Sequence, residues 1–244
     1  MFMPPKETYR SCLKTMYALR RFGIILGLDT IKNILSALGN PQNDFNCIHI
    51  AGTNGKGSVA SALSAILHES GYRVGLYTSP HLVHFNERIC INNRQIANKD
   101  VVKSYRAVKR VHHGDRSPTF FEFATAMALY AFSRQTVDWA VIETGMGGRY
   151  DATNIITPAI SIITNVSMEH RDYLGNTLVE ITREKAGIIK QGKPVVTAVK
   201  QKQARSVVQE VAQKKSAPLF MLGKDFRVRQ NQSGNFAYHG IENN

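Results

Sequence analysis

The sequence predicts an α/β fold in which helices flank a mostly parallel β-sheet. Short apolar runs rich in β-branched residues alternate with segments of helical hydrophobic spacing, and a glycine-rich stretch directly follows the first run. The first run covers residues 47–51, a helical pattern follows over 59–71, and a second apolar run covers 74–77. A strand, a helix and a strand in this order form a βαβ unit, which implies parallel strands joined by right-handed crossovers.

The stretch between the first strand and the next helix is the most informative one. It consists of Gly52, Thr53, Asn54, Gly55, Lys56, Gly57 and Ser58. Glycines let backbone N–H groups face an anion, and a helix start adds unpaired N–H donors. Lys56 adds a positive charge and Ser58 an oxygen for Mg²⁺, so we expect a nucleoside triphosphate as ligand.

The spacing of this loop departs from the common P-loop pattern G-x-x-x-x-G-K-[ST]. Gly52 precedes Gly55 by only three positions, and Gly57 separates Lys56 from Ser58. The loop is therefore a variant P-loop, and an ordinary glycine-rich turn is the alternative interpretation.

Length and composition limit the class of protein. The 244 residues, 43% of them hydrophobic, are enough for a buried core in one large domain or two small ones. Cys12, Cys47 and Cys90 lie far apart without a CxxC pair, so we expect neither a disulfide framework nor a zinc site. Because no secretory signal or membrane-length apolar run is present, we expect a cytoplasmic protein without membrane contact.

The formal net charge of +13 favours anionic ligands. The basic residues are nevertheless scattered, without a dense run or an RNA-binding pattern of interleaved aromatic residues. We therefore expect no nucleic-acid partner. Solvated basic faces explain most of the charge, and an anionic nucleotide and substrate are a second contributor.

The hydrophobic pattern predicts further elements on both sides of this βαβ unit. Helices are expected over 7–22, from a cap at Asp29 or Thr30 to residue 38, and over 99–111, 120–133, 178–189 and 201–215. Strands are expected over 139–142, 159–164 and 195–198. Hairpins are expected around Asn92 and Asn93 and across Ser233, Gly234 and Asn235. Most of the apolar face of 120–133 is expected to be core, so its aromatic residues need no functional role.

Polar residues follow two of the predicted strands. Glu143 ends the strand at 139–142, where a carboxylate can hold the Mg²⁺ of a nucleotide bound at the first loop, although a surface strand end is the alternative. The strand at 74–77 leads into a second candidate ligand loop, namely Thr78, Ser79, Pro80, His81 and Leu82. For His81 and His84 an ordinary surface position is favoured over a role as ligands or catalysts.

Four motifs together resemble the folylpolyglutamate synthase and dihydrofolate synthase family of the Mur-ligase superfamily. They are the loop at 52–58, the segment at 78–82, the run Glu-Thr-Gly-Met-Gly-Gly-Arg-Tyr-Asp-Ala-Thr-Asn at 143–154, and Glu-Lys-Ala-Gly-Ile at 184–188. The resemblance runs from about Tyr9 to Val199. It implies a Mur-ligase-like ATP-binding domain of a folate-pathway ligase that uses ATP and Mg²⁺ to add L-glutamate to folate or dihydropteroate through an acyl phosphate.

The resemblance also implies roles for individual residues. Ser58, Glu143 and His170 look like Mg²⁺ ligands, and Lys56 looks like the lysine that binds phosphate. The assignment of His170 as a Mg²⁺ ligand rests on the resemblance alone, because the hard Mg²⁺ ion ordinarily prefers oxygen ligands.

Two further assignments come from the same resemblance. Lys185 matches a lysine that is carbamylated in the family, and a lysine on a helix surface is the alternative. Glu169 stands where the family usually has an aspartate. Residues 78–82 resemble the loop that contacts the pteridine substrate.

The family carries a second, C-terminal α/β domain that helps to bind ATP and glutamate. We therefore expect residues 1–244 to form a monomeric, slightly incomplete ATP-binding domain that lacks the glutamate-ligase domain and does not form amide bonds alone. Two alternatives stay open. One is a Mur-type ligase acting on cell-wall nucleotide precursors, which the segments at 56–58 and 78–82 disfavour; the other is a nucleotide-binding module without enzymatic activity.

Overall fold

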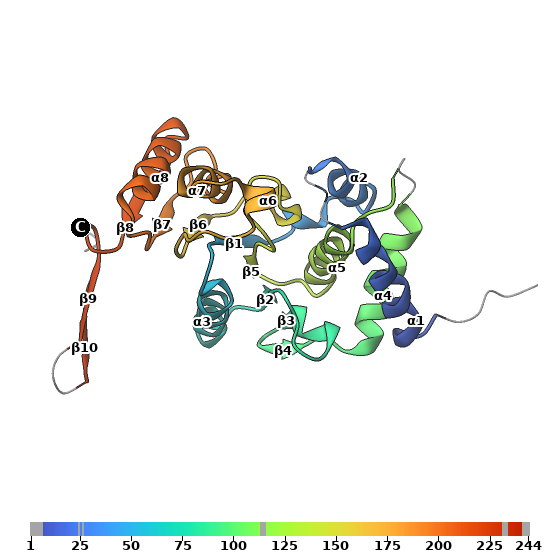
Figure 1. Ribbon diagram of the computed structural model, residues 1–244. Helices are drawn as coiled ribbons and strands as arrows, with labels where there is room; N and C mark the ends of the chain where they lie inside the picture. Colours follow the sequence, from blue (N-terminus) through green and yellow to red (C-terminus); the bar gives the residue numbers. More distant parts are fainter. Residues whose placement is uncertain (1–6, 24, 26, 113–115, 231–233, 241–244) are drawn as a thin grey trace, which may run out of the picture.

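The chain folds around an eight-stranded sheet (Figure 1). The computed structural model describes residues 7–23, 25, 27–112, 116–230 and 234–240. The strands are β1 (Asn46–Ala51), β2 (Val74–Tyr77), β3 (Ile89–Ile91), β4 (Arg94–Gln95), β5 (Trp139–Glu143), β6 (Ile160–Ile163), β7 (Val195–Thr197) and β8 (Leu219–Met221). Their order is β4-β3-β2-β5-β1-β6-β7-β8, and all pairs are parallel except those of β3. The predicted mostly parallel α/β fold is confirmed.

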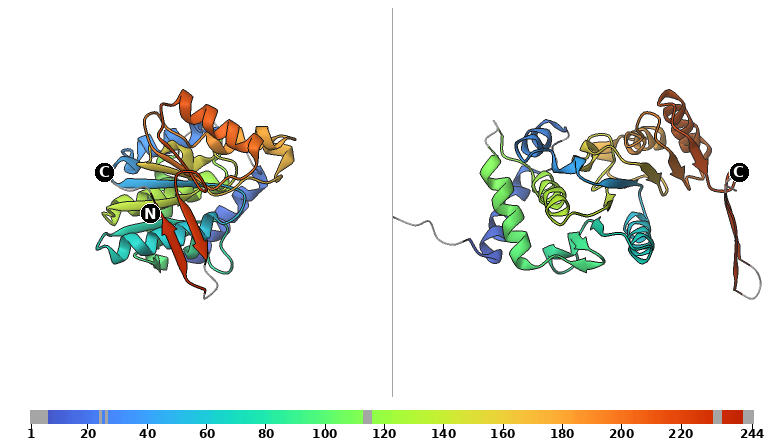
Figure 2. Two further views of the ribbon diagram at one scale, coloured as in Figure 1. Left: turned by 90° about the vertical axis from the view of Figure 1, so that its left-hand side faces the viewer. Right: turned by 180° about the vertical axis from the view of Figure 1, so that it is seen from behind.

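Helices cover both faces of this sheet (Figure 2). They are α1 (Tyr9–Ala18), α2 (Asp29–Ala37), α3 (Lys56–Glu69), α4 (Asn98–Val111), α5 (Phe120–Arg134), α6 (Arg171–Leu174), α7 (Leu178–Ala186) and α8 (Lys202–Lys214), with short 3₁₀ turns η1 (Leu19–Phe22), η2 (Pro41–Asn43), η3 (Phe85–Arg88) and η4 (Ala152–Ile155). Among the described helices, none has both the length and the apolar character needed to cross a bilayer.

Alternation along the strands decides which helix covers which face, because successive side chains of a strand point to opposite sides. Ile50 and Val141 pack with α3 on one face, whereas Ile142 packs with α5 on the other. The helices α7 and α8 cover β6 and β7 with a separate apolar cluster that includes Ile163 and Val195. The layers are therefore helix, sheet and helix.

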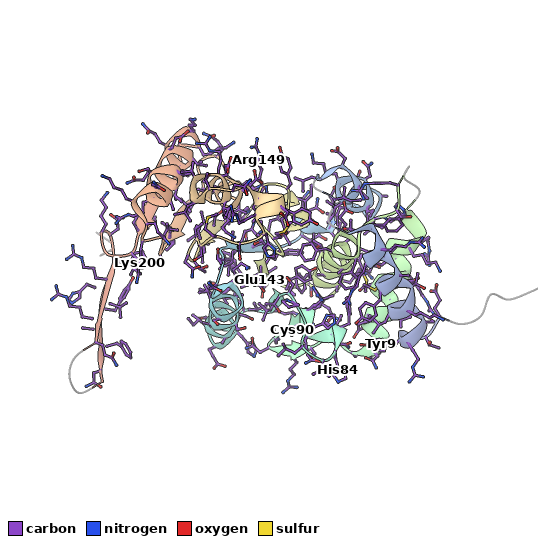
Figure 3. The ribbon with its side chains drawn as sticks, viewed as in Figure 1. Tyr9, His84, Cys90, Glu143, Arg149 and Lys200 are labelled. Carbon is purple, nitrogen blue, oxygen red and sulfur yellow. The ribbon has the colours of Figure 1, made fainter. Side chains whose placement is uncertain are left out.

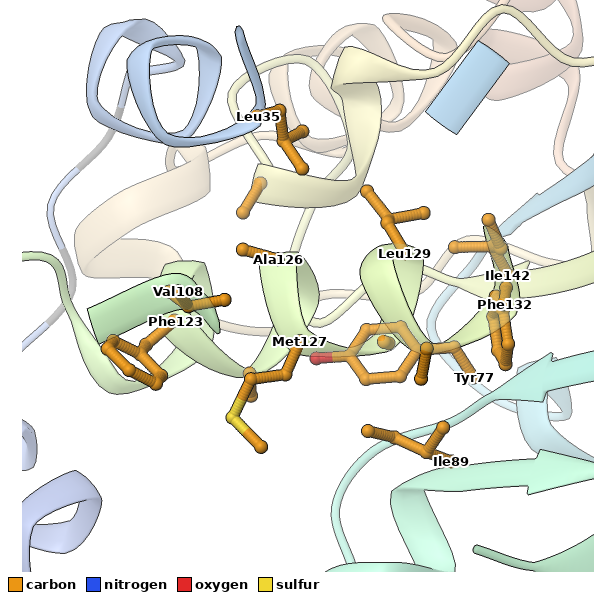
Figure 4. Close-up of a cluster of buried hydrophobic side chains, with 14 of the residues drawn as sticks. Leu35, Tyr77, Ile89, Val108, Phe123, Ala126, Met127, Leu129, Phe132 and Ile142 are labelled. Atoms are coloured by element: carbon orange, nitrogen blue, oxygen red, sulfur yellow. The ribbon is translucent and has the colours of Figure 1, made fainter. Parts of the chain in front are cut away.

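The largest apolar cluster lies between α5 and the strands β2, β3 and β5 (Figure 4). Phe132, Met127 and Tyr77 are almost completely buried there. A Cβ atom on Gly75 would lie 2.6 Å from the ring of Phe132. The absence of a side chain at Gly75 thus allows α5 to approach the sheet, and α5 brings its first turn to the carboxyl edge of the strands.

Several predicted boundaries and faces are wrong. The first helix ends at Ala18 and continues as a 3₁₀ turn, and Asp29 is the first residue of α2, with no side-chain cap from Leu28. The helix after the glycine-rich loop begins at Lys56, so part of that loop is already helical. Ile66, on the predicted apolar face of this helix, is 61% exposed. The short elements α6 and β8 were not predicted.

Both predicted hairpins are present. Asn92 and Asn93 join β3 to β4 with positive φ angles of 50° and 59°. The strands β9 (Arg227–Gln230) and β10 (Phe236–His239) form an exposed antiparallel ribbon that extends beyond β8 (Figures 1 and 2). Ser233, assigned to its turn, lies outside the described residues.

Candidate functional site

The loops that follow three central strands meet at one edge of the sheet. β1 lies between β5 and β6, and the parallel register pairs Ile50 with Glu143 and Ala51 with Ile163. Because parallel strands end on the same side, the loops after β1, β5 and β6 lie together there. The carboxyl edge of such a sheet is where open α/β folds bind ligands.

The glycine-rich loop after β1 is held by the residues that follow β6. Asn165 accepts a hydrogen bond from the Thr53 N–H at its carbonyl (3.0 Å) and one from the Asn54 N–H at its side-chain oxygen (2.9 Å). The hydroxyl of Thr164 donates to the Asn54 carbonyl at 2.7 Å. Gly52 has a φ angle of 151°, and a Cβ atom on it would lie 1.9 Å from the Thr164 Oγ1 atom. Only glycine fits this approach.

The loop presents a positive surface at the start of α3. Lys56 folds back over it, and its Nζ atom donates to the carbonyls of Gly52 (3.0 Å) and Thr53 (3.3 Å). Gly55, the residue before α3, has a φ angle of 79° and offers no side chain to cap the helix. The first N–H groups of α3 are thus without a side-chain cap, and such a helix end attracts anions.

Glu143 faces this helix start from the end of β5 (Figure 3). Its side chain is buried, and one carboxylate oxygen accepts a hydrogen bond of 3.0 Å from the Ser79 N–H. A Cβ atom on Gly57 would lie 3.7 Å from the same oxygen, so the carboxylate and the first turn of α3 are neighbours. Burial raises the pKa of Glu143 above its ordinary value of 4.5.

The oxygens near Glu143 suit a hard divalent cation. A carboxylate from β5 and a hydroxyl from Ser58 in the first turn of α3 are ligand types that Mg²⁺ prefers, and within the described part of the chain only the Ser79 N–H donates to that carboxylate. His170 directly precedes α6 and is exposed, with a left-handed φ of 45°. The donor set of Glu143 and Ser58 therefore fits Mg²⁺ on chemical grounds.

Lys185 is one of the most deeply buried large side chains of the molecule. It lies on α7 with 1% exposure, and its Nζ atom donates to the carboxylate of Glu169. The alternative of a helix-surface position is wrong for this residue. Burial lowers the pKa of Lys185, although the contact with Glu169 acts in the opposite direction.

A cavity of about 460 Å³ extends from the glycine-rich loop to an aromatic region. Thr53 and Lys56 line one part of it together with Glu169 and His170, and Met146 lies in its wall. Further lining residues are Ser79, Pro80, Arg88, Thr119, Phe120, Phe121, Glu122, Gly145, Tyr150, Asp151 and Ala152. The cavity thus connects the glycine-rich loop with a partly apolar compartment.

The segment at 78–82 contributes to the cavity only in part. Ser79 and Pro80 line it, whereas Leu82 is 90% exposed and outside the lining. The ring of His81 is held by Arg88, whose Nε atom donates to its Nδ1 atom at 2.6 Å, and by the Tyr17 hydroxyl at 3.3 Å. Burial lowers the pKa of His81. His81 therefore orders the loop, and His84 is exposed as expected.

Sequence reasoning missed the aromatic part of the cavity. Phe120 and Phe121 were given no functional role, but both line the cavity at the start of α5. The guanidinium groups of Arg20 and Arg88 lie 5.0 and 5.2 Å from the centroid of the Phe120 ring. Thr119 caps α5, and a capped helix start facing the carboxyl edge of the sheet was the available signal.

Comparison with known sequences gives one family and a consistent group of relatives. Residues 50–240 match the Mur ligase middle domain. The chain is 38% identical over 218 residues to a dihydrofolate synthase/folylpolyglutamate synthase of Bacillus subtilis, an alignment that covers 86% of this chain and 50% of that protein. The corresponding Escherichia coli protein is 36% identical over 222 residues, covering 91% and 51%. The chain thus spans about half the length of these relatives.

Solved structures of the same group share the fold. The E. coli FolC protein in complex with DHPP and ADP superposes with a TM-score of 0.91 at 32% identity, covering 98% of this chain and 57% of that one. A mutant of the L. casei folylpolyglutamate synthase gives a TM-score of 0.89 at 37% identity, covering 95% and 59%. The similarity therefore includes the sheet, its helices and the loops at its carboxyl edge.

The raised pKa of Glu143 predicts how stability depends on pH. A raised pKa means that the folded state holds the proton more tightly than the unfolded state. The stability that the protonated Glu143 side chain contributes is therefore fully present below pH 4.5 and is lost as the pH rises through the folded pKa. Glu143→Gln does not titrate and should be more stable than the wild type at pH 8, by roughly 1 kcal/mol. Urea unfolding of metal-free protein at pH 4 and pH 8 measures this.

The control for this experiment is Glu69→Gln, a change at an exposed carboxylate near the end of α3. The difference in the free energy of unfolding between this variant and the wild type should change little between the two pH values. An equal pH dependence of the two variants would show that the Glu143 carboxylate is not destabilised by burial.

Proposed function

Because the chain belongs to the Mur ligase middle-domain family, we propose that it is the ATP-binding part of a ligase that joins L-glutamate to folate or dihydropteroate. One observation carries the proposal. A single cavity connects the Lys56 loop with an aromatic compartment, so a phosphate donor and a flat conjugated acid fit side by side. Relatives in this group are named for that ligase activity, and one is described with DHPP and ADP.

The phosphates of ATP would lie on the loop at 52–58. Backbone N–H groups at the start of α3 and the Lys56 ammonium group supply the positive potential that phosphoryl transfer requires. One related structure is described as a complex with AMPPCP. The fixed loop geometry, held by Asn165, means that these donors need little reorganisation on binding.

Glu143, Ser58 and His170 would hold Mg²⁺ in this arrangement. The ion supplies neutralisation of the charge on the phosphate oxygens. Glu143 and Ser58 are the stronger candidates on ligand chemistry, whereas His170 is included because of the family resemblance and lines the cavity together with Lys56.

The proposed reaction has two steps. A carboxylate oxygen of the folate or dihydropteroate attacks the γ-phosphorus of ATP, the bond to ADP breaks, and an acyl phosphate forms. The amine of glutamate then attacks the acyl carbon, loses a proton, and inorganic phosphate leaves. Lys56 stabilises the charge at the transferred group, and Phe120, Phe121 and Arg88 enclose the conjugated ring.

Lys185 is proposed to act as a carbamate. Burial lowers its pKa, which increases the share of the neutral amine that can add carbon dioxide. The resulting anion would lie beside Glu169, so it requires the cationic surroundings that Lys56 and a bound metal ion provide. Ser79 and Pro80 are proposed as direct substrate contacts, with Thr78, His81 and Leu82 shaping their loop.

The function is tested by glutamate incorporation. A polypeptide that extends residues 1–244 to the length of the relatives should incorporate labelled glutamate into dihydropteroate or tetrahydrofolate in the presence of MgATP. Residues 1–244 alone should show at most trace incorporation, because part of the glutamate pocket and the exclusion of water are proposed to require the extension. Use of UDP-linked muramyl substrates, with pteroates ignored, would contradict the proposal.

Lys56→Ala should weaken ATP binding to residues 1–244. The substitution removes the ammonium group that lies over the loop and leaves the backbone donors in place. We expect the dissociation constant for MgATP to rise at least roughly 10-fold, measured by calorimetry. Lys14→Ala, on the exposed face of α1, changes the net charge equally and serves as the control. An equal loss of MgATP affinity in the two variants would show that the effect comes from the change in net charge.

Carbamylation of Lys185 is tested with ¹³C-bicarbonate. A carbamate carbon signal should appear in the wild-type spectrum and vanish in Lys185→Ala, and short carboxylic acids should restore part of the activity of that variant in the extended polypeptide. Lys190→Ala is the matched control, since Lys190 is half-buried, also has a pKa lowered by burial, and donates to the Asn154 carbonyl instead. A signal that persists in Lys185→Ala would remove the carbamate from this residue.

A further inference from the structure

A chain of buried polar side chains links the strand before the phosphate loop to the wall of the cavity. The His49 Nε2 atom lies 2.8 Å from the Thr153 hydroxyl, and that hydroxyl donates to the Oδ1 atom of Asp151. The Thr153 N–H also donates to Oδ1 at 3.0 Å, and the Met146 N–H donates to Oδ2 at 2.9 Å. His49 and Thr153 are completely buried, and Asp151 is 7% exposed.

The hydrogen bonds determine where the protons lie. An ionised carboxylate only accepts, so the single hydrogen of the Thr153 hydroxyl points to Asp151. The Thr153 oxygen must then accept its other bond from His49, which places a hydrogen on Nε2. The Nδ1 atom of His49 has no hydrogen-bond partner among the described residues. A hydrogen on Nδ1 would be an unsatisfied buried donor, so the neutral Nε2–H tautomer fits this environment.

Electrostatics support the neutral form. Burial, together with the nearby positive charge of Lys190, lowers the pKa of His49 to about 3. Burial raises the pKa of Asp151, while the N–H and O–H donors around its carboxylate act in the opposite direction. A protonated Asp151 would reverse the order of donors, with the Thr153 hydroxyl then donating to His49. The two arrangements are distinguishable by the His49 tautomer.

We propose that His49 is a positioning residue that, as the Nε2–H tautomer, orients the Thr153 hydroxyl toward Asp151 and thereby fixes the cavity wall formed by residues 145–152. Met146, Tyr150 and Ala152 of this segment line the cavity. Asp151 fixes the Met146 backbone by accepting its N–H. His49 lies on β1, three residues before Gly52, and contacts Thr153 from there. The network thus ties the strand that carries the phosphate loop to the wall that encloses the second ligand.

The tautomer is tested on residues 1–244 without any ligand. In ¹⁵N-histidine spectra that correlate ring nitrogens with ring protons, His49 should show a protonated Nε2 and an unprotonated Nδ1, unchanged from pH 5.5 to pH 8. Thr153→Val removes the acceptor and should shift the Nε2 signal. An Nδ1–H tautomer, or an imidazolium in this range, would overturn the proposal.

The positioning role is tested by two pairs of variants. His49→Leu and Thr153→Val remove a hydrogen-bonding group, whereas His49→Gln keeps an N–H donor and Thr153→Ser keeps the hydroxyl. The first pair should accelerate hydrogen exchange of the Met146 amide roughly 10-fold, and the second pair should restore most of the protection. Exchange at Met146 equal to wild type in Thr153→Val would contradict the proposal. General unfolding would instead accelerate exchange throughout the sheet.

The consequence for binding rests on the proposed function. The dissociation constant for dihydropteroate should rise roughly 10-fold in Thr153→Val and return to near the wild-type value in Thr153→Ser. The dissociation constant for MgATP should change less in Thr153→Val than the one for dihydropteroate. Equal weakening of both ligands would show a general structural effect and contradict the positioning role. If wild-type protein binds no dihydropteroate, the proposed function fails, whereas the tautomer and the Met146 exchange still decide the role of His49.

Discussion

The hydrogen bonds between the loop after β1 and Asn165 after β6 are the constraint on which the site depends. They fix a glycine-rich loop that would otherwise lose much conformational entropy when a ligand binds. Gly52 makes the arrangement possible, because a side chain there would collide with Thr164. With the loop fixed, Lys56 at the start of α3 lines the cavity, and the proposed triphosphate would meet donors already in place.

Charged groups from other strands and helices lie around this loop. Glu143 comes to the start of α3 through the parallel register of β1 and β5, and its burial leaves a carboxylate that a cation would stabilise. Lys185 is buried on α7 and paired with Glu169, which lines the cavity. The proposed anionic ligand and metal ion would therefore interact electrostatically with these buried groups and would change their pKa values on binding.

Sequence reasoning predicted the central part of this structure because the information there is local. Apolar runs followed by glycines or polar residues predicted β1, β2, β5 and β6, and the spacing around Lys56 predicted the loop. What it missed depends on tertiary contacts. The four-residue helix α6 follows a left-handed His170, the burial of Lys185 depends on how α7 packs, and Phe120 lines the cavity because of where the start of α5 packs. The network through His49 joins residues 104 positions apart in sequence.

The most direct test of this account is a map of where a nucleotide binds. Amide chemical shifts of residues 1–244 would be recorded during titration with Mg²⁺ and a non-hydrolysable ATP analogue. The account predicts that the largest changes lie at 52–58, at 143–146 and at 164–170, which form one edge of the sheet. Changes concentrated elsewhere, for instance along α4 or the β9–β10 ribbon, with the loop at 52–58 unaffected, would contradict it.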